Sequence, residues 1–211
     1  SSGRRSDMLT PKAREVLEAL QREGLLDRLI LIGSWCAYFY ESYFRKGSFE
    51  AGIKTLDMDF LVPKPRMLGK EAKSVKAVLE PLDFDPDFTV SGWERFVHPH
   101  LRVEFLVPRM GPTSDEPRLI KELGVIAQPL RHTSVLVENV ITIRRDKLCV
   151  NVPHPIAFAL HKLFVSTRRK EKGKRAKDME LAFRVLEAAE RSGSVKDAAV
   201  IWKAFTEKER K

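Results

Sequence analysis

Two aspartates lie two positions apart inside an apolar segment, and a third carboxylate follows in a similar setting. Asp57 and Asp59 stand in the run Leu-Asp-Met-Asp-Phe, and Glu104 stands in Val-Glu-Phe-Leu-Val. Residues two apart on a strand project to the same side of a sheet. We therefore expect the two aspartates to share one face. The apolar residues that alternate with them, and should face the core, are Leu56, Met58 and Phe60.

Two carboxylates on one face repel each other unless a cation lies between them. Hard divalent cations prefer oxygen ligands of this kind. If the strand of Glu104 pairs beside the strand of Asp57 and Asp59, three carboxylates converge and can bridge two magnesium ions. Such a pair of ions supports in-line phosphoryl and nucleotidyl transfer. An isolated Asp-x-Asp pair is also compatible with exposed strand residues.

A Gly-Ser pair stands upstream of these acids. Gly33 and Ser34 end an apolar run, and an aromatic-rich segment with helical spacing follows. We expect Ser34 to cap that helix, so that the backbone amides at its start form an anion-binding site. A phosphate site followed by an acid pair on the next strand favours a bound triphosphate.

The surrounding pattern supplies elements to position these groups. In the first half we predict helices at 10–24, 34–44 and 68–82 and strands at 25–33 and 55–63. The second half predicts a hairpin at 87–99, a strand at 101–108, a hairpin at 138–153 and helices at 155–167, 177–193 and 194–209. Residues 109–135 give no clear pattern. We predict an α/β catalytic domain over 1–152 and a helical subdomain over 153–211.

Composition bounds the class of protein. The chain has 211 residues, of which 43% are hydrophobic, and it carries a formal net charge of +9. No apolar run is long enough to span a membrane, and no secretion signal is evident, so we expect a cytoplasmic protein. The two cysteines, Cys36 and Cys149, are expected to be free thiols in the core. Much of the excess charge lies in residues 168–177, which form either a solvated loop or a surface for polyphosphate or nucleic acid.

These motifs, in this order, resemble the nucleotidyltransferase superfamily, which includes the minimal nucleotidyltransferases and the polymerase-beta-like palm. The segments are Leu-Ile-Gly-Ser, then Leu-Asp-Met-Asp-Phe-Leu-Val, then Val-Glu-Phe-Leu-Val-Pro, spread over residues 29–107. Residues 159–186 are similar to the helix pair that follows the fold in bacterial members. The resemblance implies an α+β fold with a mixed sheet flanked by helices and a C-terminal helical subdomain.

The resemblance also implies roles for individual residues. Gly33 and Ser34 would hold the triphosphate, and Asp57 and Asp59 would hold the metal ions. Glu104 would be the third metal ligand and a candidate base for the acceptor hydroxyl. The residues of the helical tail that would reach the nucleotide phosphates are Lys162, Arg168 and Lys177. The spacing from Ser34 to Asp57 is longer than in compact members and adds a loop.

We therefore expect a magnesium-dependent nucleotidyltransferase that binds ATP or another nucleoside triphosphate. It would transfer the nucleoside monophosphate to a hydroxyl on a small molecule, a protein or a nucleic acid, and release pyrophosphate. One alternative is a catalytically silent nucleic-acid-binding protein on the same fold. Others are a toxin–antitoxin-type protein that binds a partner protein, and a metal-dependent phosphodiesterase.

Several further residues carry weaker signals. Thr55 either caps the start of its strand or touches phosphate, and Asp178 is expected to orient a basic neighbour. His161 is placed where it could reach the same cleft. The residues expected to be purely structural are Trp35 and Phe39 in the core and His98 and His100 in a turn.

Overall fold

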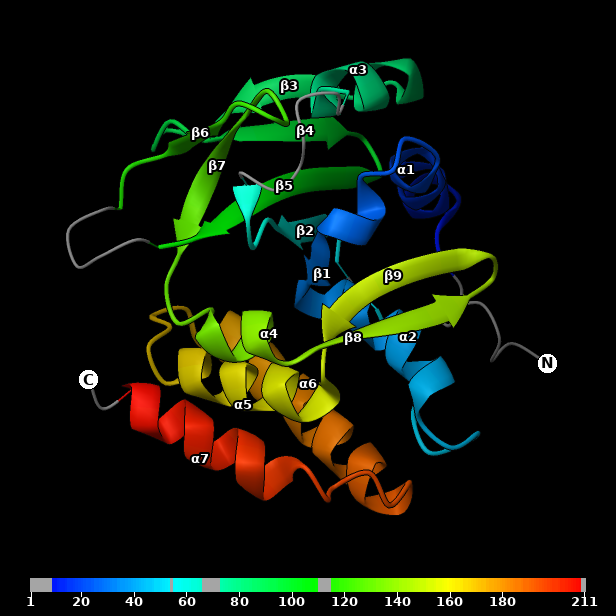
Figure 1. Cartoon of the computed structure of the whole chain (residues 1–211), viewed down its shortest axis with the longest axis vertical. Coiled ribbons are helices and arrows are strands. Elements are labelled where there is room, and N and C mark those ends of the chain that lie inside the picture. The colour runs from blue at the N-terminus through cyan, green and yellow to red at the C-terminus, as the bar shows by residue number, and fades with distance from the viewer. Residues whose placement is uncertain (1–8, 54, 66–72, 110–114, 210–211) are drawn as a thin grey trace.

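The computed structural model describes residues 9–53, 55–65, 73–109 and 115–209, with side chains described as far as residue 205. A seven-stranded mixed sheet forms one side of the molecule, and α4 to α7 pack together below it (Figure 1). This arrangement confirms the predicted mixed sheet flanked by helices. None of the helices in the described ranges is both long and apolar enough to cross a membrane.

The main sheet has the order β1-β2-β5-β4-β3, and β7 adds to β5 with β6 at its outer edge. A separate hairpin, β8–β9, lies against β1 and α2. The strands are β1 (Ile30–Ile32), β2 (Asp57–Leu61), β3 (Asp85–Phe88), β4 (Glu94–His98), β5 (Leu101–Pro108), β6 (Arg118–Ile120), β7 (Val125–Leu130), β8 (Val140–Arg145) and β9 (Leu148–Pro153).

Helices cover the sheet and build the opposite side of the molecule. They are α1 (Pro11–Arg22), α2 (Cys36–Tyr43), α3 (Val75–Leu79), α4 (Ser134–Glu138), α5 (Pro155–Ser166), α6 (Lys172–Arg191) and α7 (Ala198–Glu209). Short 3-10 turns occupy Leu26–Arg28, Gly33–Trp35 and Glu80–Leu82.

The centre of the sheet is the parallel pair β2–β5. Its register sets Asp57 opposite Arg102 and Asp59 opposite Glu104. Because side chains alternate along a strand, all four of these polar residues lie on one face. The other face of the pair is fully buried, and Phe60 stacks on a neighbouring ring there with centroids 5.7 Å apart.

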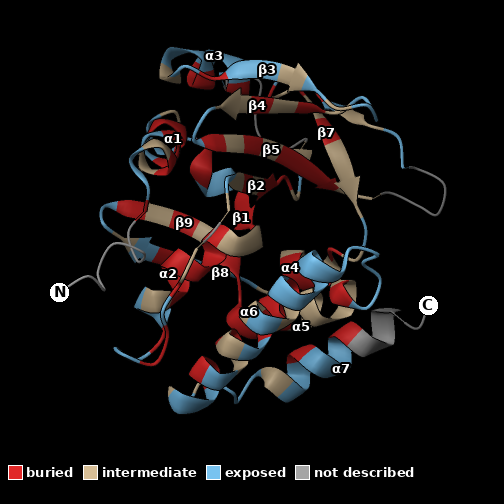
Figure 2. Cartoon of the chain, turned by 180° about the vertical axis from the view of Figure 1, so that it is seen from behind, coloured by how far each residue is buried: buried red, intermediate tan, exposed pale blue. Residues whose placement is uncertain are grey.

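The alternation predicted for β2 therefore holds, with one exception at its start. Met58 and Phe60 are fully buried, as expected. Leu56 is 52% exposed, because the strand begins only at Asp57 and Leu56 belongs to the preceding loop. The buried colour in Figure 2 runs through β1, β2 and β5, which marks the sheet centre as the core.

The first helix follows its sequence signals. Thr10 caps α1 by accepting a hydrogen bond from the backbone N–H of Ala13 at 3.3 Å, and Pro11 takes the first helical position. The predicted strand over 25–33 is wrong in length. A 3-10 turn occupies Leu26–Arg28, and only Ile30–Ile32 pair as β1.

Ser34 does not cap a helix, which corrects the prediction. It lies inside the 3-10 turn Gly33–Trp35, and α2 begins two residues later at Cys36 without a side-chain cap. Gly33 has a positive φ of 75°, which bends the chain sharply after β1 and leads directly into the tight turn. Trp35 is buried, as is Phe39, which confirms their core assignment.

The helix predicted over 68–82 is observed only in part. Residues 66–72 lie outside the described residues, and α3 covers Val75–Leu79 with Ser74 as its cap. Pro81 lies within the following 3-10 turn rather than after a long helix. Both predicted hairpins are present, β3–β4 and β8–β9, and the second turns through Asp146 and Lys147, which both have positive φ.

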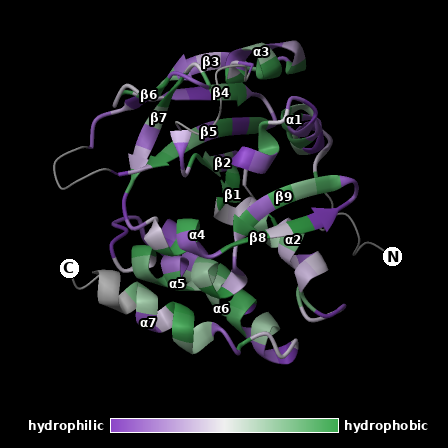
Figure 3. Cartoon of the chain, in the orientation of Figure 1, coloured by the Kyte–Doolittle hydropathy of each residue, from purple (hydrophilic) through white to green (hydrophobic). Residues whose placement is uncertain are grey.

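The tail holds the three predicted helices, but the middle one begins early. Helix α6 starts at Lys172 rather than at residue 177, because Lys, Arg and Ala favour a helix and only Gly173 opposes it. The basic segment is therefore a short connector followed by a helical turn. This connector is hydrophilic throughout (Figure 3). Cys36 is buried and Cys149 partly exposed, and both are free thiols.

Candidate active site

A cavity of about 1170 Å³ lies between the polar face of β2–β5 and the helix pair α5–α6. Its walls also include the turn after β1, the loop that leads into β2, and parts of β7 and α4. All eight residues named from the sequence line this one cavity. They are Gly33, Ser34, Asp57, Asp59, Glu104, Lys162, Arg168 and Lys177. The structure thus brings them together, while their individual roles stay predictions.

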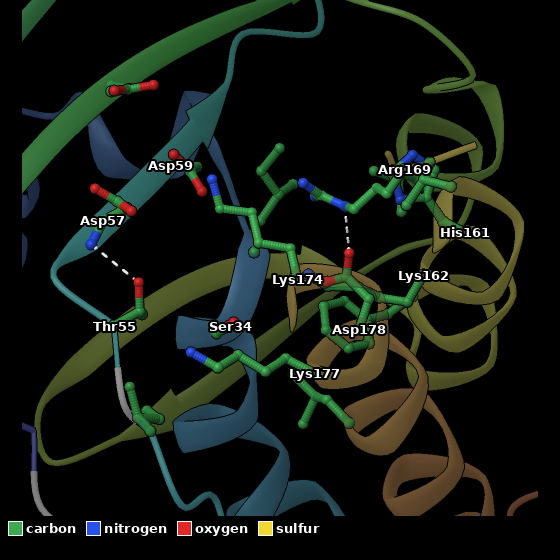
Figure 4. Close-up of a pocket in the computed structure, with 18 of the residues that line it drawn as sticks. Ser34, Thr55, Asp57, Asp59, His161, Lys162, Arg169, Lys174, Lys177 and Asp178 are labelled. Carbon is green, nitrogen blue, oxygen red and sulfur yellow. Dashed lines mark hydrogen bonds and ion pairs between the residues drawn. The ribbon is translucent and has the colours of Figure 1, made fainter. Parts of the chain in front are cut away.

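The acids form one wall of the cavity. Asp59 and Glu104 are register partners on adjacent parallel strands, which lie about 4.8 Å apart in a sheet. Asp57 sits on the same face, and its Oδ1 lies 2.7 Å from Nε of Arg102. This ion pair is half exposed. Arg102 is therefore an internal counter-ion for one of the three carboxylates (Figure 4 shows Asp57 and Asp59 on β2).

Of the three carboxylates, Asp59 has the most strongly shifted pKa. Burial first, and then the charges of Glu104 and Asp57, raise its pKa to about 7 against the opposing effect of Lys162 and Arg102. The pKa of Glu104 is also raised, first by burial and then by Asp57. Within the described part of the chain, no hydrogen bond or ion pair reaches the Asp59 carboxylate. Asp59 is partly buried, and such a carboxylate without a partner is costly unless a cation neutralises it.

Gly33 makes this arrangement possible. A Cβ atom at position 33 would lie 2.7 Å from Oδ2 of Asp59, closer than van der Waals contact allows. Ile32 is the register partner of Asp59, so the turn after β1 passes directly beside that carboxylate. Only glycine combines the positive φ with the missing side chain that this approach needs.

The donor set suits a hard divalent cation, although it is not arranged as a complete site. Among the residues that the structure describes, no three His, Cys, Asp or Glu side chains are grouped as metal ligands. Asp57 instead contacts Arg102. Three carboxylates on one face, one of them partly buried and without a partner, nevertheless offer the oxygen chemistry that magnesium prefers. The donor types of Asp57, Asp59 and Glu104 thus fit such an ion, and their role as its ligands stays a prediction.

A buried ion-pair network forms the opposite wall. Lys162 on α5 lies 2.6 Å from Oδ1 of Asp178 on α6, and Nε of Arg169 lies 2.5 Å from Oδ2 of the same carboxylate. Lys162 and Asp178 are only 12% and 9% exposed at their side chains. Asp178 therefore orients two basic neighbours, as expected from the sequence. It also fixes α5 against α6.

Further cations line the cavity, among them two on α6 and one at its edge. Lys174 and Lys177 point from α6 toward β2 and the turn that carries Ser34 (Figure 4). Arg168 is exposed, and its guanidinium carbon lies 3.6 Å above the ring centroid of Phe164. It therefore presents a flat charged face at the rim.

Sequence reasoning missed several residues of this site. Arg102 was visible beside Glu104 on the same strand face but was given no role. Arg184 also lines the cavity and donates a hydrogen bond to the carbonyl of Glu50 in the long loop before β2. The only signal for this loop was the long spacing between Ser34 and Asp57. The loop residues that line the cavity are Ala51, Gly52, Ile53, Thr55 and Leu56.

Two weaker predictions find a place here. The hydroxyl of Thr55 accepts a hydrogen bond from the backbone N–H of Asp57 at 3.1 Å, so Thr55 caps the start of β2. His161 also lines the cavity, but its Nε2 atom is shielded from solvent and lacks a hydrogen-bond partner. Burial first, and then the charges of Lys162 and His132, lower its pKa to about 4.

Known structures with a similar fold include the antibiotic-resistance factor ANT(2'')-Ia in solution, with 14% identity over 94% of each chain and a TM-score of 0.47. A crystal structure of ANT(2'')-Ia in complex with adenylyl-2''-tobramycin shares 16% identity over 93% of this chain and 95% of that chain, with a TM-score of 0.49. An antigenic nucleotidyltransferase-like protein from Paracoccidioides brasiliensis shares 12% identity over 83% and 74% of the two chains, with a TM-score of 0.47.

No curated protein matches the chain. At the level of sequence families, residues 12–205 match the family described as nucleotidyltransferase. This match includes both walls of the cavity, from the turn at Gly33 to the cations of α6. Since it spans nearly the whole chain, the protein belongs to the nucleotidyltransferase family, whose members are enzymes that transfer nucleoside monophosphates.

Proposed function

We propose that the protein is a magnesium-dependent enzyme that transfers a nucleoside monophosphate from a nucleoside triphosphate to a hydroxyl group and releases pyrophosphate. The observation that carries this proposal is the contact between the turn at Gly33 and the unpaired carboxylate of Asp59, inside a cavity whose other wall is basic. Family membership supports nucleotidyl transfer in general, and this contact supports the choice of metal and donor.

The two walls of the cavity would have different roles, metal binding by the acids and phosphate binding by the cations. The acids would hold magnesium, which neutralises the triphosphate and makes the α-phosphorus more electrophilic when it is bound. The backbone and hydroxyl of Ser34 lie where they can donate hydrogen bonds to phosphate oxygens, as at other anion-binding turns. Lys162 faces the acids across the cavity, and Asp178 keeps its ammonium group in place.

The transfer itself would then be a single in-line displacement. The acceptor oxygen attacks the α-phosphorus and forms a new P–O bond, while the bond from the α-phosphorus to the bridging oxygen breaks. Pyrophosphate leaves with the electrons of that bond. Glu104 would take the proton of the hydroxyl, because it is adjacent to Asp59 and on the same face. Positioning and charge neutralisation supply most of the rate in such reactions.

Calorimetric titration tests the proposal. ATP, GTP, CTP and UTP are titrated with and without magnesium into the wild type, Asp59→Asn and the control Asp85→Asn. Asp85 is exposed on β3 of the same sheet and does not line the cavity. We expect at least one triphosphate to bind in a magnesium-dependent way to the wild type and the control but not to Asp59→Asn. A pyrophosphate-release assay with candidate acceptors follows.

The alternatives predict other results. A catalytically silent nucleic-acid-binding protein would bind oligonucleotides but no triphosphate. A toxin–antitoxin-type protein would bind triphosphate only in the presence of its partner protein. Equal triphosphate binding to the wild type and Asp59→Asn would contradict the metal-dependent site.

A further inference from the structure

The connector between α5 and α6 and the first turn of α6 concentrate positive charge. Seven of the ten residues from 168 to 177 are Lys or Arg, and only Glu171 is acidic. All ten are exposed. We call residues 168–177 the basic lip, because this segment starts at the cavity wall and continues outside it.

The basic lip has two parts. Its inner residues line the cavity and are Arg168, Arg169, Lys174 and Lys177. Its outer residues, Lys170, Lys172 and Arg175, do not line the cavity. No hydrogen bond or ion pair of these three side chains occurs within the described ranges. Three exposed cations in six residues, without acidic partners, give this surface a positive potential that attracts anions.

A triphosphate held in the cavity does not account for the outer residues. It would lie against the inner wall. There Lys162 and Arg169 already form ion pairs with Asp178. Arg102 likewise forms an ion pair with Asp57. The outer cations lie beyond this wall, where they are placed to contact a second, more extended anion. Such an anion could also reach the cavity, since the lip is continuous with it.

We propose that the acceptor hydroxyl belongs to the end of a nucleic acid strand, whose backbone phosphates run along the basic lip while the end enters the cavity. The inference rests on the proposed function, because it names the acceptor of the same site. Phosphate contacts by Lys and Arg supply most of the affinity of such strands and need no sequence preference.

Two observations favour a nucleic acid over other acceptors. A polycationic acceptor such as an aminoglycoside would be repelled by the lip, and a small neutral sugar would leave the outer cations unused. Arg168 adds a planar group at the rim, because its guanidinium is stacked 3.6 Å above the ring centroid of Phe164. A terminal base can stack on such a face.

The transfer balances as a one-nucleotide extension. The terminal hydroxyl oxygen of the strand attacks the α-phosphorus of the triphosphate, and the bond to the bridging oxygen breaks. The proton of the hydroxyl passes to Glu104, and pyrophosphate leaves. The strand ends as a phosphodiester that carries one more nucleotide.

A matched pair of variants tests the inference. The lip variant is Lys170→Gln/Lys172→Gln/Arg175→Gln. The control variant is Arg22→Gln/Lys121→Gln/Arg144→Gln, three exposed cations that lie outside the cavity and lack an ionic partner in the described structure. Both variants lose three positive charges. Probes are single-stranded RNA and DNA oligonucleotides with a free or a phosphate-blocked 3′ end, and phosphatidylserine vesicles. An aminoglycoside and an unrelated protein are offered as competing acceptors.

We expect both variants to bind triphosphate as the wild type does. Oligonucleotide binding, measured by fluorescence anisotropy from 50 to 200 mM salt, should weaken at least tenfold in the lip variant alone. The slope of log K against log salt should become shallower by about 2, because each of the three lost phosphate contacts contributes roughly 0.7 to it. Label from α-labelled triphosphate should appear on the free-ended strand and not on the blocked one.

Other results would overturn the inference. Equal oligonucleotide binding by the lip and control variants would remove its basis, as would lip-dependent binding to vesicles but not to oligonucleotides. Normal triphosphate binding with label on an added aminoglycoside or a protein, and none on the strand, would overturn the acceptor while leaving the proposed function intact. Absence of triphosphate binding in the wild type would overturn both.

Discussion

Gly33 and Asp59 are so close that no side chain fits between them. A Cβ atom at position 33 would lie 2.7 Å from Oδ2 of Asp59, and the positive φ of 75° disfavours any other residue as well. The turn at Gly33 and the acid wall are thus coupled by one contact.

Gly33→Ala should destabilise the protein and abolish magnesium-dependent triphosphate binding, because the methyl group pushes Asp59 away. Gly24→Ala is its control, since Gly24 has a φ of 65° but nothing within 4 Å of its Cβ position. Backbone strain alone costs about 1–2 kcal/mol at such sites. We expect a larger loss of unfolding free energy in urea for Gly33→Ala than for Gly24→Ala. If both variants lose the same unfolding free energy and Gly33→Ala still binds triphosphate, the contact between Gly33 and Asp59 does not have this role.

The buried pair of Lys162 and Asp178 should be strongly coupled. Asp178→Asn removes the charge that holds both Lys162 and Arg169, and breaking a buried pair costs on the order of 3–5 kcal/mol. Lys162→Met leaves Asp178 with Arg169 alone. A double-mutant cycle in urea should give a coupling energy of about 1–3 kcal/mol. Additive effects of the two changes would show that the pair contributes little.

Arg184 should hold the loop before β2 in place. It donates to the carbonyl of Glu50, lies 5.6 Å above the ring centroid of Phe49 and passes 3.2 Å from the Cβ position of Gly52. Arg184→Gln should speed hydrogen exchange in this loop with a loss of stability of about 1 kcal/mol. Arg191→Gln is the control, because Arg191 pairs on the surface with Glu187 of the same helix. Unchanged loop exchange in Arg184→Gln would rule out this role.

His161 should make the protein sensitive to acid. Its folded-state pKa is lowered to about 4 from the ordinary value of 6.5, so the fold favours the neutral ring. The stabilisation from this group is complete above pH 6.5 and is lost as the pH falls toward 4. The shift corresponds to about 3 kcal/mol at most.

Urea unfolding of His161→Leu between pH 7 and pH 4 measures this effect. We expect the unfolding free energy of this variant to depend less steeply on pH than that of the wild type. His100→Gln serves as control, since His100 is exposed and outside the cavity. If the unfolding free energy of His161→Leu falls between pH 7 and pH 4 as steeply as that of the wild type, the pH dependence comes from other groups.

The acid wall was predictable because it depends on local alternation. The spacing of Asp57 and Asp59, and the same period around Glu104, assign the polar faces of two strands without any knowledge of their pairing. The pairing itself was stated only as a condition, since parallel strands whose paired residues lie 45 positions apart in the chain, such as Asp59 and Glu104, leave no local signal. The observed register of Asp59 with Glu104 fulfils it.

Features that depend on distant packing were missed. The pairing of Lys162 with Asp178 arises only when α5 lies against α6, so the sequence predicted a basic neighbour for Asp178 but did not identify Lys162 as that neighbour. Strand β7 was not recognised, because it contains Pro129 and pairs with the end of β5 across a long connection. Ser34 was misplaced as a cap because a 3-10 turn and a helix start share the same residue preferences. The boundary near residue 152 stays a prediction.

The acid wall of the cavity and the α5–α6 wall that faces it come from different parts of the chain. Every carboxylate of the acid wall precedes residue 105, whereas the facing cations of α5 and α6 begin at Lys162. Chains are synthesised from the N-terminus, and early parts can fold before later ones appear. A nascent chain therefore contains the turn at Gly33 and its acid wall before the cations of α5 and α6 that face them. The cavity has its second wall only once the helical tail has docked on the sheet, which is late in synthesis.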